Sequence, residues 1–504
     1  MKKHLRFICL AMVALFCLSA VACAQSNDDT TVDTTTAQAA VENTPAEETT
    51  TASDEETTAP QKLSALPDDL DFEGATVNFL YWNDVERPEF FADSMTGDNV
   101  NDAIYQRNLN VEDRLKVQLN YIGEKGNVSN SDNFLKKVQN SFNAGAKEFD
   151  ILASHSRTGG VVAAGGMAMD LLDIDDSYID LSMPWWPESI TETATIGDKM
   201  YFISGDISTN TLHFMYGVYY NADQITALGL EDPTPLALDG KWTLDKMIAM
   251  SENLYQDNNG NEKKDFGDTF GLTTLYFHAD SFYSGAGMRW IDKDANGNTI
   301  VSPDYSSEKA INLAEKLAAW FNTNDCYTEN NNANTYNTFS QGRALFAQNR
   351  IYIADNTHAS GLNNASFKYG VVPIPKYEES QERYYTTVGN PFTLYEIMLG
   401  CDKTEMATAV LECLGEEGYN LTTPAIFEVN MKYKYSSNDQ TAQAFDLIRS
   451  NIIFDLGRLF GAKLSTMSEI YSKACIDNQS WATASKANSR MVERLLGKLL
   501  ESFE

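Results

Sequence analysis

The feature that most constrains the fold is an alternation of apolar and amphipathic segments between residues 75 and 153. Strands are predicted at Ala75–Trp82, Val117–Ile122 and Phe149–Ala153. Between them, the apolar stripe of residues 100–115 and the segment Ser131–Gly145 predict helices. Strands and helices that alternate at this spacing predict a parallel α/β sheet, in which the loops after the strands form the binding face.

A second constraint is the stretch Lys199–Asn221. Its last part, Leu212–Tyr220, is apolar along its whole length, and a helix is predicted to begin after Asn221. A fully apolar run belongs at the centre of a sheet or at a crossing between domains, not at a half-exposed edge. Because 504 residues exceed one ordinary core, we expect two lobes with a ligand cleft where the chain crosses between them.

The formal net charge is -33. A surface of this sign repels phosphate backbones and anionic lipid head groups, which argues against nucleic-acid binding. It is compatible with neutral or cationic small ligands. The charge therefore excludes a class of partner without identifying the ligand.

The first 22 residues have the pattern of a secretory signal peptide: a basic start, the apolar stretch Phe7–Leu18 and small residues before Cys23. The segment Ala20–Cys23 resembles a bacterial lipobox, which predicts a lipid on Cys23 and attachment to the outer face of the cell membrane. Cleavage without lipidation at the Ala-x-Ala pattern is the alternative. Residues 23–61 are rich in Thr, Asp and Glu and lack aromatic residues, so we expect a disordered tether.

Four cysteines fall in the remainder of the chain, widely separated and without the CxxC spacing of zinc or redox motifs. They are Cys326, Cys401, Cys413 and Cys475. We interpret them as buried small hydrophobic residues, and their disulfide state stays open.

Several ordered segments together resemble the extracellular solute-binding protein family 1, the sugar-binding lipoproteins of ABC importers. The resemblance extends from about Phe72 to the C-terminus and is carried by these segments: Thr76–Asp84, Asn101–Val117, Phe149–Gly160, Val218–Asn221, Lys241–Leu244, Phe339–Phe346 before an expected strand at Ile351–Ala354, and a turn at Gly370–Pro375. The order and spacing of these segments carry the resemblance, because none is specific alone.

The resemblance implies an α/β, two-lobed fold of the type II periplasmic-binding-protein class, with lobes joined by crossing hinge segments. Crossings are expected near Phe214, Asp355 and residues 400–403. The N-terminal lobe is then 72–213 plus 355–400, and the C-terminal lobe 214–354 plus 403–504. Helices are predicted within the last part at Thr404–Glu416, Gln440–Arg449, Leu464–Ile476 and Asn488–Ser502.

A sugar needs aromatic faces for its C–H patches, and amides and carboxylates for its hydroxyls. Position after strands and the resemblance together give the candidate ligand-binding residues Trp82, Asn83, Asp84, His155, Arg157, Tyr283, Trp290, Asp355 and Trp481. For Trp82, packing in the core is an equal alternative. No residue is assigned a catalytic role.

One loop has the spacing of an EF-hand calcium site. Oxygen donors occupy positions 1, 3, 5, 7, 9 and 12 of the loop that begins at residue 257: Asp257, Asn259, Asn261, the Lys263 carbonyl, Asp265 and Asp268. Glu262 stands where glycine usually makes the turn, and Asp268 where a longer Glu usually binds. The prediction is a structural Ca²⁺, with a solvated acidic turn as the alternative. No other cofactor is expected.

These observations predict a monomeric, non-enzymatic receptor that captures a carbohydrate, in particular an oligosaccharide, and delivers it to an ABC-transporter permease. One alternative is a secreted glycosidase, although no catalytic motif appears. Another is a binding protein for a peptide or other polar solute, and a third is a surface adhesin or spacer. The sequence does not identify the sugar, its length or its linkage.

Overall fold

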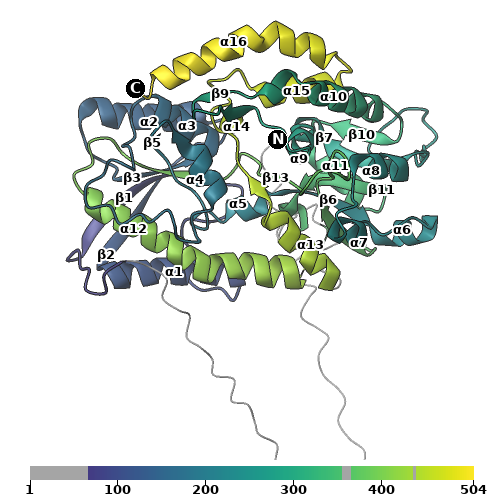
Figure 1. Cartoon of the computed structure of the whole chain (residues 1–504). Coiled ribbons are helices and arrows are strands. Elements are labelled where there is room, and N and C mark those ends of the chain that lie inside the picture. The colour runs from purple at the N-terminus through teal and green to yellow at the C-terminus, as the bar shows by residue number, and fades with distance from the viewer. Residues whose placement is uncertain (1–65, 355–361, 363–364, 435–438) are drawn as a thin grey trace, which may run out of the picture. The chain divides into compact units, whose positions relative to one another are not determined.

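The computed structural model describes residues 66–354, 362, 365–434 and 439–504 (Figure 1). Four predictions fall outside the described residues: the signal peptide, the lipidation of Cys23, the disordered tether at residues 23–61 and the candidate ligand residue Asp355.

The first sheet confirms the alternation predicted near the N-terminus. Its strand order is β14-β3-β1-β2, with β1, β2 and β3 parallel and β14 antiparallel to β3. The strands are β1 (Ala75–Trp82), β2 (Val117–Glu124), β3 (Ile151–His155) and β14 (Thr393–Ile397). The intervening helices are α1 (Asn99–Leu115), α2 (Ser131–Ala144) and α3 (Ser156–Ala164). The Asp98 carboxylate caps α1 by accepting from the backbone N–H groups of Val100 and Asn101.

The second sheet has the order β10-β7-β11-β6-β12. Strands β7, β10 and β11 are parallel, whereas β6 is antiparallel to both β11 and β12. The strands are β6 (Tyr216–Asn221), β7 (Phe270–Leu275), β10 (Cys326–Glu329), β11 (Ala344–Arg350) and β12 (Tyr369–Pro373). Every residue of β6, β7 and β11 is buried, so the apolar run at the end of the Lys199–Asn221 stretch does lie inside a sheet.

Further helices and strands of two or three residues lie between the strands of the two sheets along the chain. The helices are α4 (Glu188–Ala194), α5 (Asn210–His213), α6 (Ala222–Leu228), α7 (Pro233–Leu238), α8 (Leu244–Ser251), α9 (Asp280–Gly285), α10 (Glu308–Phe321) and α11 (Asn332–Ser340). The strands are β4 (Thr195–Ile196), β5 (Lys199–Met200), β8 (Ile291–Lys293), β9 (Thr299–Val301), β13 (Thr386–Thr387) and β15 (Ile452–Ile453).

The C-terminal part is helical, as predicted. It contains α12 (Thr404–Glu417), two π-helical segments (Gly418–Thr422 and Ala425–Lys434), α13 (Asp439–Arg449), α14 (Leu456–Leu459), α15 (Met467–Ile476) and α16 (Trp481–Glu501). Helix α16 runs along both halves in Figure 1. At one end it packs on α10, and just beyond its other end Phe503 contacts Tyr201 and Phe460, the residue after α14.

The pairing register defines the first two of the chain's crossings between the sheets. The first crossing leads through α5 into β6, which begins at Tyr216 opposite Arg350, the last residue of β11. The second leads from the end of β12 through β13 to the start of β14, where Thr393 lies opposite His155. Both crossings therefore join the edges at which the parallel strands end.

The predicted lobe boundaries need correction in the later part of the chain. Strand β12 pairs with β6 in the second sheet, whereas the prediction placed residues 355–400 in the first lobe. Helix α12 packs on α1, and Lys403 pairs with Asp150 next to β3, so residues 403–417 lie with the first sheet. The expected crossing at 400–403 is thus replaced by the later passage from α12 to α13, which packs on β12. The expected strand at Ile351–Ala354 is a 3₁₀ turn that follows β11.

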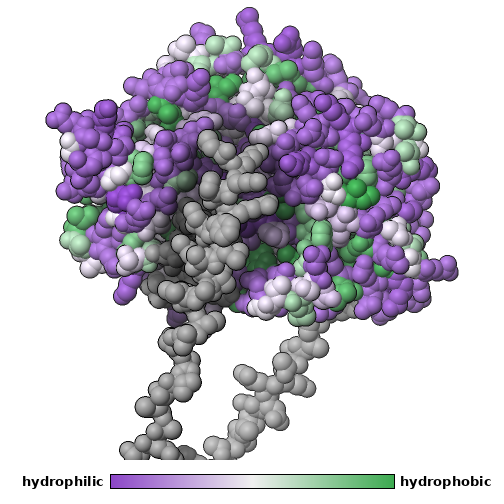
Figure 2. Space-filling model, turned by 180° about the vertical axis from the view of Figure 1, so that it is seen from behind, coloured by the Kyte–Doolittle hydropathy of each residue, from purple (hydrophilic) through white to green (hydrophobic). Residues whose placement is uncertain are grey.

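Figure 2 shows a face on which hydrophilic residues predominate and apolar residues are scattered among them. Within the described part of the chain, no helix combines the length and apolar character needed to cross a membrane.

Candidate functional site

Polar and aromatic side chains follow the parallel strands of both sheets. In the first sheet, β1 is followed by Asn83, Asp84 and Arg87, and β3 ends at His155. In the second sheet, β7 is followed by Tyr276 and Phe277, which are partly exposed and lie edge to face with ring centroids 5.3 Å apart. Ligands of open α/β sheets bind at such strand ends.

The strand ends of the two sheets face each other. Arg87, in the loop after β1, places its guanidinium carbon 5.2 Å from the ring centroid of Tyr352, which follows β11. The backbone carbonyl of Arg87 also accepts a hydrogen bond from the side chain of Asn210 on the first crossing. The region around these residues is therefore bounded by both sheets and by a hinge segment, and we call it the strand-end site.

Arg350 forms the floor of the strand-end site. Its guanidinium lies 5.0 Å from the ring centroids of Phe214 and Tyr352 and donates to the Tyr352 hydroxyl at 3.4 Å. The hydroxyl groups of Tyr352 and Tyr336 are 2.6 Å apart. These residues come from the first crossing, the end of β11 and helix α11, so the floor depends on how the two halves are joined.

Two ion pairs lie beside the floor. Arg157 of α3 pairs with Glu469 of α15 at 2.7 Å, which links a helix of the first sheet to a helix that packs on α10. Arg458 of α14 pairs with Asp280 of α9, and both side chains are buried. In each pair, an arginine and a carboxylate near the strand ends neutralise each other.

The predicted ligand residues Trp82 and His155 are buried. The Trp82 indole N–H donates to the Thr393 hydroxyl at 2.8 Å, and its ring lies edge to face against His155. Burial and the nearby Arg157 cation lower the pKa of His155 to about 3, so its ring stays neutral and accepts from the backbone N–H of Arg157. Both residues support the strand-end site from below and expose no face to a ligand.

Asn83 and Asp84 are more accessible. Asn83 is exposed, whereas the Asp84 carboxylate accepts hydrogen bonds from the backbone N–H groups of Gly126 and Asn127 and from the side chain of Asn130. Asp84 therefore holds the loop before α2 in place. Of Trp82, Asn83 and Asp84, the residues predicted at the end of β1, only Asn83 has an exposed side chain.

The structure brings together Tyr283, Trp290 and Trp481, but in a buried cluster. The rings of Tyr283 and Trp290 are stacked at 3.8 Å, and Trp481 lies edge to face with Trp290 and Tyr471. All four side chains are fully buried. The predicted role of these three residues as sugar-stacking surfaces is not supported by this arrangement, because their faces are covered by one another.

Sequence reasoning missed Arg87, Arg350, Tyr352, Tyr276 and Phe277. The expected strand at Ile351–Ala354 displaced the strand end by four residues, which hid Arg350 and Tyr352. Tyr276 and Phe277 follow an apolar segment that was not assigned as a strand. The sequence signal that could have found these residues is an apolar run that ends abruptly and is followed at once by a charged residue or by two adjacent aromatic residues.

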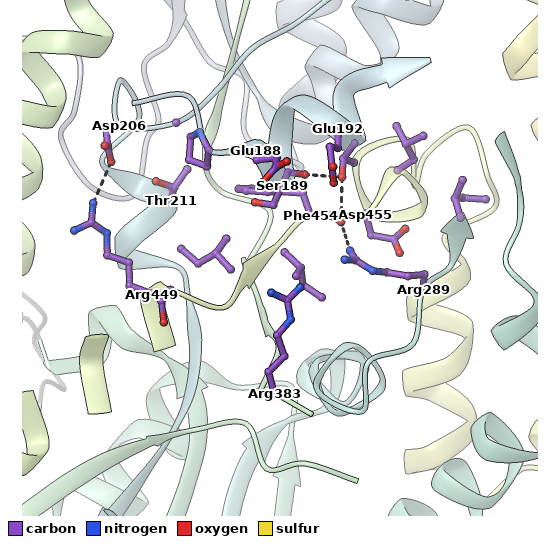
Figure 3. A pocket seen from close by; sticks show the side chains of 18 of the residues that line it. Glu188, Ser189, Glu192, Asp206, Thr211, Arg289, Arg383, Arg449, Phe454 and Asp455 are labelled. Atoms are coloured by element: carbon purple, nitrogen blue, oxygen red, sulfur yellow. Dashed lines mark hydrogen bonds and ion pairs between the residues drawn. The ribbon is translucent and has the colours of Figure 1, made fainter. Parts of the chain in front are cut away.

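A separate cavity of about 630 Å³ lies along the first crossing (Figure 3). Its walls come from α4, from residues 205–212, from β8 and from the segment 449–456. Figure 3 shows Arg449 directed toward Asp206, and Arg289 toward the carbonyl of Phe454. Burial raises the pKa values of Asp206 and Asp455, which line this cavity, to about 6. Because most of its charged groups already have protein partners, we rank the cavity below the strand-end site.

The predicted calcium loop folds around its own side chains. The Asp257 carboxylate accepts from the backbone N–H groups of Gly260 and Glu262, and the side-chain amides of Asn259 and Asn261 both donate to Asp265. Glu262 adopts the left-handed conformation, with φ of 58°, at the position where glycine is usual. Backbone hydrogen bonding, chiefly from Glu262, lowers the pKa of Asp257 and keeps it ionised.

The oxygen donors of this loop are of several kinds, carboxylate, amide and backbone carbonyl, and Ca²⁺ accepts such a mixture. Within the described residues, no group of three or more His, Cys, Asp or Glu side chains could hold a metal ion. A cation in this loop would therefore take part of its coordination from the Asn259 and Asn261 amides and the Lys263 carbonyl. Calcium accepts such neutral oxygen donors together with carboxylates.

Comparisons with known proteins give the family. The model of a bacterial extracellular solute-binding protein family matches residues 115–417, more than half of the chain. No curated protein sequence matches the chain significantly.

Solved structures share the fold. A cyclo/maltodextrin-binding protein complexed with maltotetraose gives a TM-score of 0.54 at 12% identity, over 84% of this chain and 97% of that one. The galacto-N-biose/lacto-N-biose I-binding protein of Bifidobacterium longum, in complex with lacto-N-biose, gives 0.54 at 13% identity, over 86% and 98%. The GacH receptor of Streptomyces glaucescens gives 0.53 at 14% identity, over 84% and 99%.

The fold is thus that of an α/β binding protein of the type II periplasmic-binding-protein class. The chain belongs to the bacterial extracellular solute-binding proteins.

Proposed function

We propose that this protein captures a carbohydrate, in particular an oligosaccharide, at the strand-end site and delivers it to the permease of an ABC importer. The observation that carries the proposal is the contact between Arg87 and Tyr352, because it brings the strand ends of both sheets around one site. The partly exposed rings of Tyr276 and Phe277 supply apolar faces for sugar C–H groups, and Asn83 supplies an amide for hydroxyls.

Two of the solved proteins with a similar fold are in complex with sugars, maltotetraose and lacto-N-biose. This supports a carbohydrate ligand over a peptide or another polar solute. Movement of the two sheets about the crossings would open and close the site. The protein acts as a monomeric receptor and not as a glycosidase, in keeping with a family of binding proteins.

The test is thermal melting of the purified protein against a panel of mono- and oligosaccharides. A ligand that binds only the native state stabilises it by about 3 kcal/mol at one hundred times its Kd, and the melting midpoint rises as a result. We expect a shift with one sugar class and no release of reducing ends. Reducing ends that accumulate with time would favour the glycosidase, and a flat response to every sugar would remove carbohydrate from the proposal.

The localisation is part of the proposal. A lipid on Cys23 would fix the protein to the outer face of the cell membrane, and residues 24–61 would tether the folded part within reach of the permease. The support is the order of basic start, apolar stretch and Ala20–Cys23 in the sequence.

We also propose that the loop from Asp257 to Asp268 binds a structural Ca²⁺. The support is the convergence of Asn259, Asn261 and Asp265 and the ionised state of Asp257. The ion would hold the segment between α8 and β7 in place.

A further inference from the structure

The loop after β1 directs one buried carboxylate toward the first and second crossings. Glu89 is fully buried, and its backbone carbonyl accepts a hydrogen bond from the Arg107 guanidinium of α1 at 2.8 Å. The next carbonyl, that of Phe90, accepts from the same guanidinium at 2.7 Å. Helix α1 therefore holds the backbone of the loop, while the Glu89 side chain reaches the segments that join the two sheets.

The Glu89 carboxylate accepts three hydrogen bonds from those segments. On the first crossing, the Ser208 hydroxyl donates to Oε2 at 2.8 Å, and the backbone N–H of Asn210 donates to the same oxygen at 3.0 Å. At the end of the second crossing, the Thr393 hydroxyl donates to Oε1. A single side chain thus binds both crossings to the loop that begins at Asn83.

The two hydroxyl donors are themselves held in place. Thr393 accepts from the Trp82 indole N–H at 2.8 Å, and Ser208 accepts from the backbone N–H of Thr393 at 3.1 Å, so each hydroxyl keeps its own proton for Glu89. Burial raises the pKa of Glu89, and the hydrogen bonds counteract this rise because they favour the charged form. An ionised carboxylate can accept from all three donors at once.

Beyond Asn210, the first crossing changes its partners. The Phe214 carbonyl accepts from the backbone N–H of Gly389 on the second crossing at 2.8 Å, and the Met215 carbonyl accepts from the N–H of Ile351, which follows β11, at 2.9 Å. Residues 211–214 therefore lie between the part of the crossing that Glu89 holds and the part that the second sheet holds.

We infer that Glu89 is a positioning residue for ligand capture, which holds the loop after β1 and the adjoining ends of the first and second crossings as one unit with the first sheet. This inference rests on the proposed carbohydrate-binding function. When the site closes, bending of the first crossing falls on residues 211–214, and the loop that carries Asn83 keeps its place. If the loop moved independently, fewer molecules would be competent to bind, and the apparent affinity would fall by the same factor.

The experiment compares the purified parent protein with Glu89→Gln. Glutamine keeps the shape of the side chain but replaces one acceptor oxygen with an N–H₂ donor, so it cannot accept from all three groups. Amide hydrogen exchange without ligand measures how firmly the loop and the crossing are held. We expect exchange about tenfold faster in residues 83–90 and 206–213 of the variant, with the strands of both sheets unchanged.

Calorimetric titration measures the consequence for binding. The probes are oligosaccharides of glucose, galactose, mannose and xylose, titrated well below the melting midpoint of each variant. We expect Glu89→Gln to bind the sugar that the parent protein binds about tenfold more weakly, because fewer molecules hold the loop in place.

Four outcomes would count against the account, and they are distinguishable. Parent-like exchange in residues 83–90 and 206–213 would overturn the inference. Faster exchange spread evenly over both sheets would also overturn it, since that indicates a loss of global stability. Faster local exchange with unchanged affinity would overturn the role in ligand capture. If the parent protein bound none of the sugars, the carbohydrate function would fall, and the exchange result would still decide whether Glu89 holds the crossing.

Glu396→Gln is the matched control. Glu396 lies on β14, as Thr393 does, and is equally buried, but its carboxyl group accepts from the Ser154 hydroxyl of β3 at 2.8 Å, within the first sheet. Burial raises the pKa of Glu396 well above its usual value, so the group is protonated near neutral pH and glutamine replaces it closely. This variant should keep parent-like exchange in residues 83–90 and 206–213 and parent-like affinity. The inference would be wrong if it matched Glu89→Gln in both measurements.

Ser208→Ala is the second variant. It removes one donor from the side of the first crossing and leaves Glu89 in place, so it serves if Glu89→Gln does not fold. It should also speed exchange in residues 83–90 and 206–213 and weaken sugar binding. Parent-like behaviour in both measurements would overturn the inference.

Discussion

Trp290 lies at the centre of the buried aromatic cluster. It stacks on Tyr283 at 3.8 Å and contacts Tyr471 and Trp481 edge to face. The backbone of Gly457 approaches so closely that an added Cβ would lie 2.5 Å from the Trp290 Cβ. This packing ties the segment after α9 to α14, α15 and α16, so the side chain acts on stability and not on ligand binding.

We predict that Trp290→Ala lowers the free energy of unfolding by roughly 3–5 kcal/mol, because it leaves a large cavity in a packed core. Trp290→Phe should cost less, since it keeps part of the stacked surface. Urea denaturation measures the change. The interpretation would be contradicted by a Trp290→Ala protein that unfolds like the parent protein but no longer binds sugar.

At the residue scale, the sequence predicted where the strand-end loops lie but not which side chains face the ligand. The sequence allows Trp82 to lie in the core or in the cleft, and the structure places it in the core, where its indole N–H donates to Thr393 of β14. Tyr283 and Trp290 have the composition of a sugar platform, yet their role depends on α15 and α16, which lie far away in sequence. Such long-range contacts leave no local pattern to read.

At the element scale, strands and helices with clear periodicity were predictable. The three first strands and α12 agree closely with expectation, whereas α16 begins at Trp481 instead of Asn488 because Ser480 caps it. The segment from Ala344 to Ala354 has apolar residues on both sides of Gln348–Arg350, so its pattern allows the strand to stop at this polar break or to lie beyond it. The antiparallel partner β6 begins opposite Arg350 and sets that end.

The calcium loop gives a prediction at the same scale. We expect calcium to raise the melting midpoint of the protein relative to EDTA, and Asp257→Asn to abolish this shift, because the substitution removes a carboxylate from a site that also uses neutral oxygens. Thermal melting with and without calcium is the measurement.

Asp294→Asn provides the control for the calcium loop. Asp294 accepts from the backbone of Asn296 and Asn298 in the turn between β8 and β9, so it resembles Asp257 in its local hydrogen bonds. The calcium shift should survive in this variant. Identical midpoints in calcium and EDTA for the parent protein would refute the calcium proposal.

At the scale of the whole molecule, the strand ends of the two sheets face each other, and the first two crossings join these edges. A third crossing runs from α12 to α13. The sequence predicted the two-sheet organisation and the first crossing near Phe214. It misplaced β12 and α12 because assignment of a segment to one half depends on strand pairing and helix packing, not on its own pattern.

The most direct test of the central claim is amide hydrogen exchange of the protein with and without its bound carbohydrate. The account predicts slower exchange in the loops after β1 and β3 of the first sheet and in the segments after β7 and β11 of the second, because a solute at the strand-end site contacts both edges. Protection confined to one sheet, or to residues 184–193 and 449–456 around the separate cavity, would contradict it.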